Sequence, residues 1–255
     1  MIDTHAHLSS RFSDEIKIAG LDWIILAASC VQDSKDNLEL NKNNPKLLPA
    51  IGIHPIEIED NSGELEKLID DRVVAIGECG LEFTDDISDT DRKKQIELFR
   101  NQIKLAQKYK LPLIVHARKA VDEAVKILKE YENINGVFHC YAGGIKRIKK
   151  VTELKCEWYF GIDGNLTYEI GLEEVVKNIP KDRLILETDC PYLTPVPFRG
   201  EKNCPEYVKY VYQKVSEIWQ MSFEETEKML INSIKKHNWK LTHTHNFKGN
   251  NISII

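Results

Sequence analysis

Short apolar runs alternate with longer amphipathic stretches along the whole chain. Several of the apolar runs are almost continuously hydrophobic, as expected for parallel strands that are covered on both faces. The predicted strands are Met1–Ala6, Trp23–Ala28, Leu47–Ile53, Val73–Gly77, Leu113–His116, Gly136–Cys140, Trp158–Ile162 and Leu184–Glu187.

The stretches between these runs carry apolar residues at helical spacing. The clearest one extends from about Asp91 to Tyr109, where Phe99 and Ile103 belong to one apolar face and either Asp89 or Thr90 is suited to cap the start. Further helices are predicted at Ala120–Tyr131, Ile145–Leu154 and Leu172–Asn178, and beyond the last strand at about Cys204–Trp219 and Ser222–His237.

This alternation of eight strands with helices predicts a parallel TIM (β/α)8 barrel of the α/β class. A doubly wound open sheet is the alternative, and the number of strands favours the barrel. The length of 255 residues is typical of one such barrel, and no change of composition marks a second domain. We therefore expect a single domain over residues 1–240, with the last two helices packed on the barrel, followed by a loosely ordered tail over residues 241–255.

Composition and charge narrow the classes of function. Because the net charge is −5, any contact with nucleic acid needs local basic patches or bound metal ions. None of the six cysteines forms a CxxC pair, and the sequence shows neither a signal peptide nor a membrane span. We expect reduced thiols in a cytoplasmic protein that contacts no membrane, and no feature indicates an obligate protein partner.

The first predicted strand ends in a short histidine motif, Asp3-Thr4-His5-Ala6-His7. Side chains alternate between the two faces of a strand, so His5 and His7 point the same way. Two imidazoles on one face can bind a single divalent ion. Two hydrogen-bonded core histidines would give the same pattern, so this motif alone leaves both interpretations open.

Other predicted strands end in side chains of the same kind. The metal-capable residues that close or directly follow a strand are His5, His7, Glu78, His116, His139 and Asp189. In a (β/α)8 barrel these strand ends meet at one mouth, where active sites are built. Random placement rarely puts six such side chains at these positions, so the sequence predicts a metal centre at the mouth.

Six potential ligands are too many for one tetrahedral ion and suit two divalent ions that share a bridging ligand. Glu78 lies on a middle strand and has two oxygens, which makes it the natural bridge. The simplest division assigns His5, His7 and Asp189 to one ion. It assigns His116 and His139 to the other.

At this point the sequence resembles the TatD family of metal-dependent deoxyribonucleases, which belong to the amidohydrolase-type barrels. The resemblance covers roughly residues 1–240, and its motifs occur in family order. They are MIDTHAHL, AIGIHP (50–55), AIGECGLE (75–82), LPLIVHAR (111–118), FHCYAGG (138–144), GIDGNLTY (161–168) and ETDCPYLTPVPFRGEKNCP (187–205).

The resemblance implies a TIM-type barrel with two divalent metal ions, Mg²⁺ or Mn²⁺, with Zn²⁺ as an alternative occupant in crystals. It implies a nuclease that trims 3′ ends of DNA, although some relatives are linked to removal of D-amino acids from tRNA. Matched motif positions give the ligand assignment reached above from strand ends. They also place Glu82 where the family usually has Asp, so one methylene is added close to the bridge, and Cys140-Tyr141-Ala142 replaces a segment usually richer in Phe and Ser.

Further residues are candidates for catalysis and substrate binding. Asp189 is the best candidate to take a proton from an attacking water, and it acts together with the bridging Glu78. His54, Arg118 and Arg199 are candidate phosphate contacts, although packing at Pro55 explains His54 and a solvent-exposed loop explains Arg199 equally simply. Candidates to orient the metal-binding imidazoles are Asp3, Glu82 and Glu187, and Tyr192 and Phe198 are candidates to stack on a base.

The leading function is hydrolysis of phosphodiesters in DNA, either single-stranded or at 3′ ends, with RNA as a further substrate. The alternative is an amidohydrolase-type cleavage of C–N or ester bonds, including deacylation of D-aminoacyl-tRNA. A phosphate site requires cationic loop residues such as Arg118 and Arg199, whereas a carbonyl site does not. A non-catalytic metal-binding scaffold is disfavoured because all six ligand positions are filled.

Overall fold

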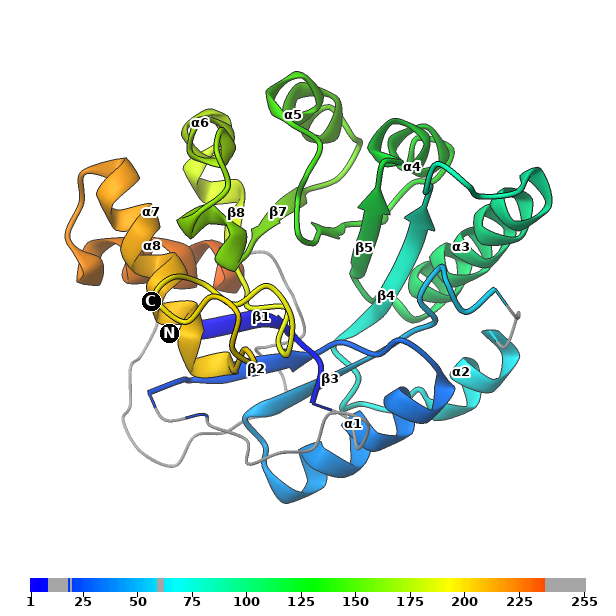
Figure 1. Cartoon of the computed structure of the whole chain (residues 1–255). Coiled ribbons are helices and arrows are strands. Elements are labelled where there is room, and N and C mark those ends of the chain that lie inside the picture. The colour runs from blue at the N-terminus through cyan, green and yellow to red at the C-terminus, as the bar shows by residue number, and fades with distance from the viewer. Residues whose placement is uncertain (9–17, 19, 59–61, 237–255) are drawn as a thin grey trace.

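The computed structural model describes residues 1–8, 18, 20–58 and 62–236, and it confirms the predicted barrel. Eight parallel strands follow one another in sequence order and curl into a nearly closed barrel with helices outside (Figure 1). The strands are β1 (Ile2–Ala6), β2 (Trp23–Leu26), β3 (Leu47–Ile51), β4 (Ala75–Glu82), β5 (Leu113–Arg118), β6 (Gly136–Phe138), β7 (Trp158–Ile162) and β8 (Leu184–Leu186). A bridge between Ala6 and Cys190 joins β1 to the segment that follows β8.

The barrel interior follows the alternation of side chains along the strands. One apolar cluster takes Ile114 from β5, Val137 from β6 and Ile185 from β8, and α8 adds Ile234. Two residues after these three positions come His116 on β5, His139 just after β6 and Glu187 just after β8, so continued alternation directs all three side chains into the mouth. A second, larger cluster fills the space between the strands and the outer helices.

Two strands are longer than predicted. The prediction ended one strand at Gly77 and the next at His116, whereas β4 continues to Glu82 and β5 to Arg118. The glycines in this segment suggest the end of a strand, but in the structure they let the backbones of β4 and β5 approach each other closely. Gly80 has φ +135°, and a Cβ on it would lie 2.0 Å from the carbonyl oxygen of His116.

The helices surround the barrel in sequence order. They are α1 (Val31–Asn43), α2 (Ser62–Leu68), α3 (Asp89–Tyr109), α4 (Val121–Leu128), α5 (Ile145–Thr152), α6 (Leu172–Asn178), α7 (Val208–Trp219) and α8 (Phe223–Lys236). Short 3-10 turns occur at η2 (Gly164–Thr167), η3 (Lys181–Arg183) and η4 (Pro205–Tyr207). The predicted cap of α3 was wrong, because the hydroxyl of Ser88 accepts the hydrogen bond from the Asp91 N–H.

The sequence did not predict α1 or α2, and packing explains why. The buried face of α1 is largely polar and includes Asp33, Ser34 and Asn37. The side-chain amide of Asn37 donates hydrogen bonds to the carbonyls of Leu26 and Ala50, so it binds strand backbone instead of packing against apolar side chains. A helix that is held in this way carries no apolar stripe in its sequence.

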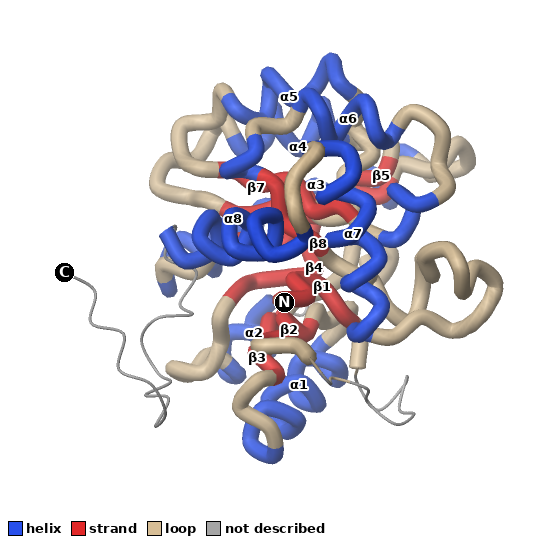
Figure 2. The backbone as a smooth tube through the Cα atoms, turned by 90° about the vertical axis from the view of Figure 1, so that its left-hand side faces the viewer, coloured by secondary structure: helices blue, strands red, loops and turns tan. Residues whose placement is uncertain are grey.

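The two C-terminal helices pack on the barrel as expected. Figure 2 shows α7 and α8 beside β8 and β1. On α7, the hydroxyl of Tyr212 donates to the carbonyl of Ile2, 3.3 Å away. No helix among the described residues is long and apolar enough to cross a bilayer. The predicted tail, residues 241–255, lies outside the described residues.

Candidate metal centre

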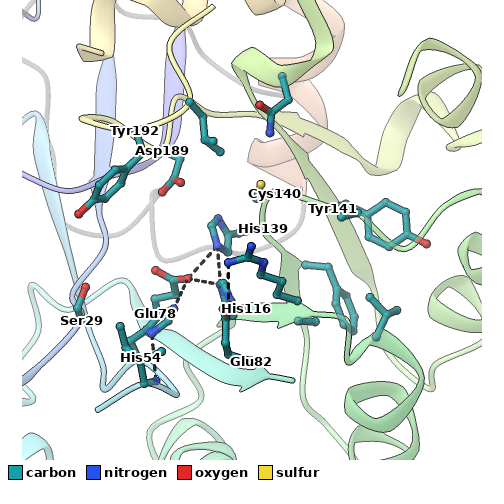
Figure 3. Close-up of a pocket in the computed structure, with 18 of the residues that line it drawn as sticks. Ser29, His54, Glu78, Glu82, His116, His139, Cys140, Tyr141, Asp189 and Tyr192 are labelled. Atoms are coloured by element: carbon teal, nitrogen blue, oxygen red, sulfur yellow. Dashed lines mark hydrogen bonds and ion pairs between the residues drawn. The ribbon is translucent and has the colours of Figure 1, made fainter. Parts of the chain in front are cut away.

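The strand ends surround a cavity of about 740 Å³ at the mouth of the barrel (Figure 3). Its lining includes His7, Glu78, His116, His139 and Asp189, and His5 lies fully buried beside them. The structure therefore brings together all six residues that the sequence selected as metal ligands.

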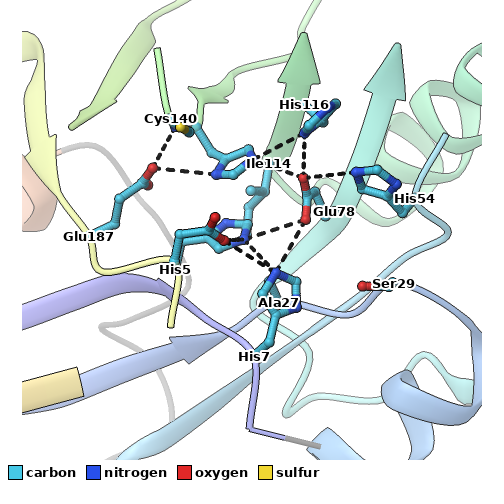
Figure 4. A network of polar contacts seen from close by, with 12 residues as sticks. His5, His7, Ala27, Ser29, His54, Glu78, Ile114, His116, Cys140 and Glu187 are labelled. Atoms are coloured by element: carbon cyan, nitrogen blue, oxygen red, sulfur yellow. Dashed lines mark hydrogen bonds and ion pairs between the residues drawn. The ribbon is translucent and has the colours of Figure 1, made fainter. Parts of the chain in front are cut away.

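Glu78 stands between two sets of nitrogen atoms. Its Oε1 lies 2.8 Å from Nδ1 of His116 and 2.8 Å from Nε2 of His139. Its Oε2 faces the other way, 3.5 Å from Nε2 of His5 and 3.4 Å from Nε2 of His7 (Figure 4). One carboxylate oxygen thus faces each set, which is the arrangement that a bridging ligand needs.

We call the first set the first donor group: Nε2 of His5, Nε2 of His7, Oδ1 of Asp189 and Oε2 of Glu78. The two imidazole nitrogens are 3.2 Å apart, and each lies 3.4 Å from Asp189 Oδ1. Ligands arranged tetrahedrally at about 2.0–2.1 Å from one ion are separated by about 3.3–3.4 Å. The two imidazole nitrogens therefore lie at the distances from each other and from both carboxylate oxygens that ligands of one divalent ion have.

The second donor group consists of Nδ1 of His116, Nε2 of His139, Nε2 of His54 and Oε1 of Glu78. The nitrogens of His116 and His139 are 3.3 Å apart. His54 Nε2 lies 3.4 Å from Glu78 Oε1, within reach of a shared ion. The sequence pattern predicts a phosphate contact for His54, yet this residue also follows an apolar run at an inward-facing position, the same signal that selected the other donors.

Two of the three residues expected to orient imidazoles lie against an imidazole ring. Glu82 Oε2 is 2.5 Å from Nε2 of His116, and Glu187 Oε1 is 3.4 Å from Nδ1 of His139. Asp3 instead contacts backbone and a hydroxyl: it accepts hydrogen bonds from the N–H groups of His5 and Thr188 and from the Thr188 hydroxyl. Asp3 therefore positions the first donor group through the seam between the first and last strands.

The two arginines selected from the sequence lie in different places. Arg118 lines the cavity, and its side chain is 67% exposed while Nη1 donates to Oε1 of Glu82. Arg199 is exposed on the loop after β8, with its guanidinium 4.1 Å from the centre of the Tyr168 ring. It is absent from the described cavity lining, so the structure brings only Arg118 to the donor groups.

Some lining residues carried no signal in the sequence argument. Ser29 follows β2, and Asn165 and Glu169 lie in and just after the η2 turn. Cys140 follows β6 with φ +44°, and Asp189 has φ +53°, a conformation uncommon for residues other than glycine. Such backbone conformations are frequent at functional sites, but they cannot be predicted from the sequence.

The electrostatics of the cluster favour cations. Burial alone would raise the pKa of Glu78, but the neighbouring His139, His54 and His116 hold that pKa well below its usual value. Conversely, burial lowers the pKa of His139, whereas Glu78 and Glu187 outweigh it and hold that pKa well above its usual value. Without metal ions, protons on the imidazoles therefore supply the positive charge that ionised carboxylates require.

Imidazole nitrogens and carboxylate oxygens at these spacings suit divalent transition metals, so the residues present fit a two-ion centre. His5, His7 and Asp189 would hold one ion, and His116 and His139, with His54 alongside, would hold the other. Glu78 would contact both. The cavity above leaves room for a substrate against this floor.

Comparison with known proteins agrees with this arrangement. A family model described as TatD related DNase matches residues 2–237. A Bacillus subtilis protein, the uncharacterized metal-dependent hydrolase YabD, is 36% identical over 92% of this chain and 98% of its own length. The uncharacterized metal-dependent hydrolase YjjV of Escherichia coli is 30% identical over 91% of this chain and 95% of its own.

Solved structures show the same barrel. The crystal structure of YjjV, described as a TatD homologue from Escherichia coli, superposes with a TM-score of 0.82 at 28% identity and covers 91% of this chain and 95% of its own. A TatD family hydrolase from Entamoeba histolytica gives a TM-score of 0.81 at 26% identity, over 92% and 97% of the two chains. Family model, sequence and fold agree, and the chain belongs to the TatD family of metal-dependent hydrolases.

Proposed function

We propose that this hydrolase cleaves phosphodiester bonds in DNA, in single strands or at 3′ ends, with two divalent ions. The observation that carries the proposal is the position of Glu78, which turns one carboxylate oxygen to each of two donor groups on the cavity floor. Bound there, two divalent ions would supply Lewis acidity toward a phosphate oxygen and lower the pKa of a water molecule.

Asp189 is the residue that we assign to accept the proton of the attacking water. Its side chain is 14% exposed at the cavity, compared with 4% for Glu78, so water reaches it more readily. Burial would raise the pKa of Asp189, but hydrogen bonding to His7 and the charges of the histidines lower it, which keeps the carboxylate ionised. An ionised carboxylate beside the reacting water is suited to general base catalysis.

Arg118 and Tyr192 are the residues that we assign to substrate. The guanidinium of Arg118 retains donors beyond the one used by Glu82, and these suit a non-bridging phosphate oxygen. Tyr192 is half exposed and lines the same cavity, with its ring 6.2 Å from that of His7. A base on the reacting nucleotide would stack on this ring while its phosphate lies over the donor groups.

The donor chemistry also bears on the choice of metal. The first donor group contains two imidazole nitrogens and two carboxylate oxygens, and imidazole suits Zn²⁺ and other transition metals better than Mg²⁺. We therefore propose Mn²⁺ or Zn²⁺ as the ions that this centre retains, with Mg²⁺ from the family resemblance as the comparison.

The charges of the cavity lining also favour a second candidate function. Arg118 is the only Lys or Arg among the described cavity-lining residues, whereas Glu78, Glu82, Glu169 and Asp189 are all acidic. Apart from bound metal ions, such a lining offers little positive charge to attract a polyanion. Hydrolysis of an ester or C–N bond, as in deacylation of D-aminoacyl-tRNA, needs no such cationic residues.

A substrate panel tests the proposal. Protein stripped with chelator and reconstituted with Mg²⁺, Mn²⁺ or Zn²⁺ is assayed on single-stranded DNA, on RNA and on D-aminoacyl-tRNA at equal concentrations. We expect cleavage of DNA at the highest kcat/KM and no cleavage by the stripped protein. Faster hydrolysis of D-aminoacyl-tRNA than of DNA would overturn the proposal in favour of the alternative.

A further inference from the structure

The paired strands β4 and β5 continue beyond the level at which their neighbours end. In this extension Gly80 pairs with His116, and Glu82 pairs with Arg118. Glu82 therefore lies on the extension of β4, opposite Arg118 and two residues beyond the position that pairs with His116. Side chains on strands are held more precisely than side chains on loops.

The carboxylate of Glu82 uses a separate oxygen for each of two partners. Oε2 lies 2.5 Å from Nε2 of His116, and Oε1 accepts a hydrogen bond from Nη1 of Arg118 at 3.0 Å. The Glu82 side chain is only 10% exposed, so water competes little for these contacts. Its backbone N–H is bound separately, by Oε1 of Gln95.

The contact between Glu82 and His116 affects the nitrogen with which His116 can bind a cation. Its Nδ1 faces Glu78 in the second donor group, at 2.8 Å, while its Nε2 faces Glu82. A carboxylate at Nε2 holds the ring hydrogen on that nitrogen and leaves the lone pair of Nδ1 for a cation. Arg118 is fixed at the rim by the same carboxylate.

We propose that Glu82 is a positioning residue that holds the His116 imidazole for the second donor group and the Arg118 guanidinium for the substrate at the same time. Cation binding and substrate binding thereby depend on one carboxylate. The family resemblance puts Asp at this position, and an aspartate ends about 1.5 Å shorter. The longer glutamate can span both partners. Only the Arg118 half of the proposal rests on the proposed function.

The test uses Glu82→Gln, which preserves size but leaves one oxygen for two donors. Titration of stripped protein with Mn²⁺ alone, followed by calorimetry, should show the affinity for the second ion reduced about 10–100-fold, the usual effect of losing a partner behind a metal ligand. Glu169→Gln is the matched control, because it removes the same charge from the cavity lining without touching His116 or Arg118. Equal Mn²⁺ affinities for wild type and Glu82→Gln would overturn the proposal.

The substrate half is tested with Arg118→Met. We expect it to raise KM without changing Mn²⁺ affinity, and to add nothing when combined with Glu82→Gln, since the guanidinium is then already unanchored. Full additivity of the two KM changes would contradict the shared carboxylate. If the protein cleaves no DNA, the proposed function fails, while the Mn²⁺ titration still decides the His116 half.

A spectroscopic measurement guards against a folding artefact. The imidazole ¹⁵N shifts of His116 report which nitrogen carries the hydrogen, and in wild-type protein loaded with Zn²⁺ they should show it on Nε2. Glu82→Gln should shift this signature while the melting temperature stays close to that of Glu169→Gln. An unchanged His116 signature in a folded variant would overturn the proposal.

Discussion

The two donor groups are built from the sequence in different ways. The first takes His5 and His7 from one short motif, and Asp189 joins them across the seam, where Asp3 ties β1 to the residues after β8. Its two imidazole nitrogens lie 3.2–3.5 Å from each other and from the two carboxylate oxygens. Local spacing in one motif thus determines the positions of its two imidazoles.

The second donor group depends on the relative positions of several strands. His116 lies on β5, whereas His54 follows β3 and His139 follows β6, and their distances to Glu78 Oε1 vary from 2.8 to 3.4 Å. It also adjoins the exposed Arg118 through Glu82. We therefore expect the first group to retain its ion tightly and the second to exchange its ion more readily.

The largest effect should come from Glu78, which both groups share. Glu78→Ala removes one ligand from each ion and leaves buried imidazoles without their carboxylate. We expect kcat/KM on DNA to fall by more than ~100-fold, beyond the loss caused by partners behind the ligands. Steady-state assays at saturating Mn²⁺ measure it, with Glu169→Gln as control. Retention of full activity would remove the bridge from the mechanism.

The next effect separates the groups directly. His116→Ala removes a donor from the second group only, so the protein should retain one tightly held ion after dialysis, whereas wild type retains two. His7→Ala should instead impair the ion that is hardest to remove. Metal analysis of dialysed proteins gives the stoichiometry, and identical losses in the two variants would show that the groups do not differ as we infer.

The same contrast explains what the sequence could predict. His5 and His7 can be identified from the sequence because side chains two residues apart on a strand point to the same face. Glu78, His116, His139 and Asp189 follow because apolar runs stop at them, and barrel topology then places all strand ends together. The fold itself was predictable for the same reason, since eight buried strands leave eight apolar runs.

What the sequence could not supply depends on packing between elements. The long β4 was predicted to end at Gly77, because a glycine looks like a strand end when the neighbouring backbone is unknown. The sequence selected Glu82 to orient an imidazole, but it gave no sign of the contact between Glu82 and Arg118. The helix α1 escaped prediction because Asn37 and its polar neighbours bind strand carbonyls, which leaves no apolar period.

A smaller effect concerns the seam that supports the first group. Asp3→Ala leaves the buried N–H groups of His5 and Thr188 without the acceptor that they share, at a cost of about 1–3 kcal/mol for each unsatisfied donor. We expect a melting temperature lower by several degrees and weaker retention of the first ion. Thermal melts of stripped protein measure the first expectation, and an unchanged melting temperature would contradict it.

The charge balance of the first group predicts a pH dependence. In stripped protein, burial lowers the pKa of His7, but hydrogen bonds to Asp189 and Glu78 outweigh it and raise that pKa from 6.5 to about 9. Stability from such a group is present below pH 6.5 and is lost as the pH rises through about 9. Stripped protein should therefore melt at a lower temperature at pH 9 than at pH 6.5.

Bound ions should reverse this trend, because they take the place of the proton and bind best to neutral imidazole. Melts at both pH values, with and without Mn²⁺, provide the measurement. His243→Gln, a change outside the donor groups and outside the described residues, controls for histidines elsewhere in the chain. The same pH trend in the presence and absence of Mn²⁺ would mean that the protons and the ions do not share these nitrogens.

The smallest effect should arise at the rim beside the first group, where Tyr192 offers a half-exposed ring. Stacking of a base on an aromatic side chain contributes about 1–3 kcal/mol by alanine substitution, and we expect the lower value here because water reaches the ring. Tyr192→Ala should therefore raise KM about 5-fold on an oligonucleotide and leave kcat nearly unchanged, whereas Tyr192→Phe should behave as wild type. An oligonucleotide whose terminal residue lacks its base supplies the decisive control. Wild type and Tyr192→Ala should bind it equally, since no base remains to stack, and a KM difference that persists on the abasic substrate would assign Tyr192 to loop packing instead.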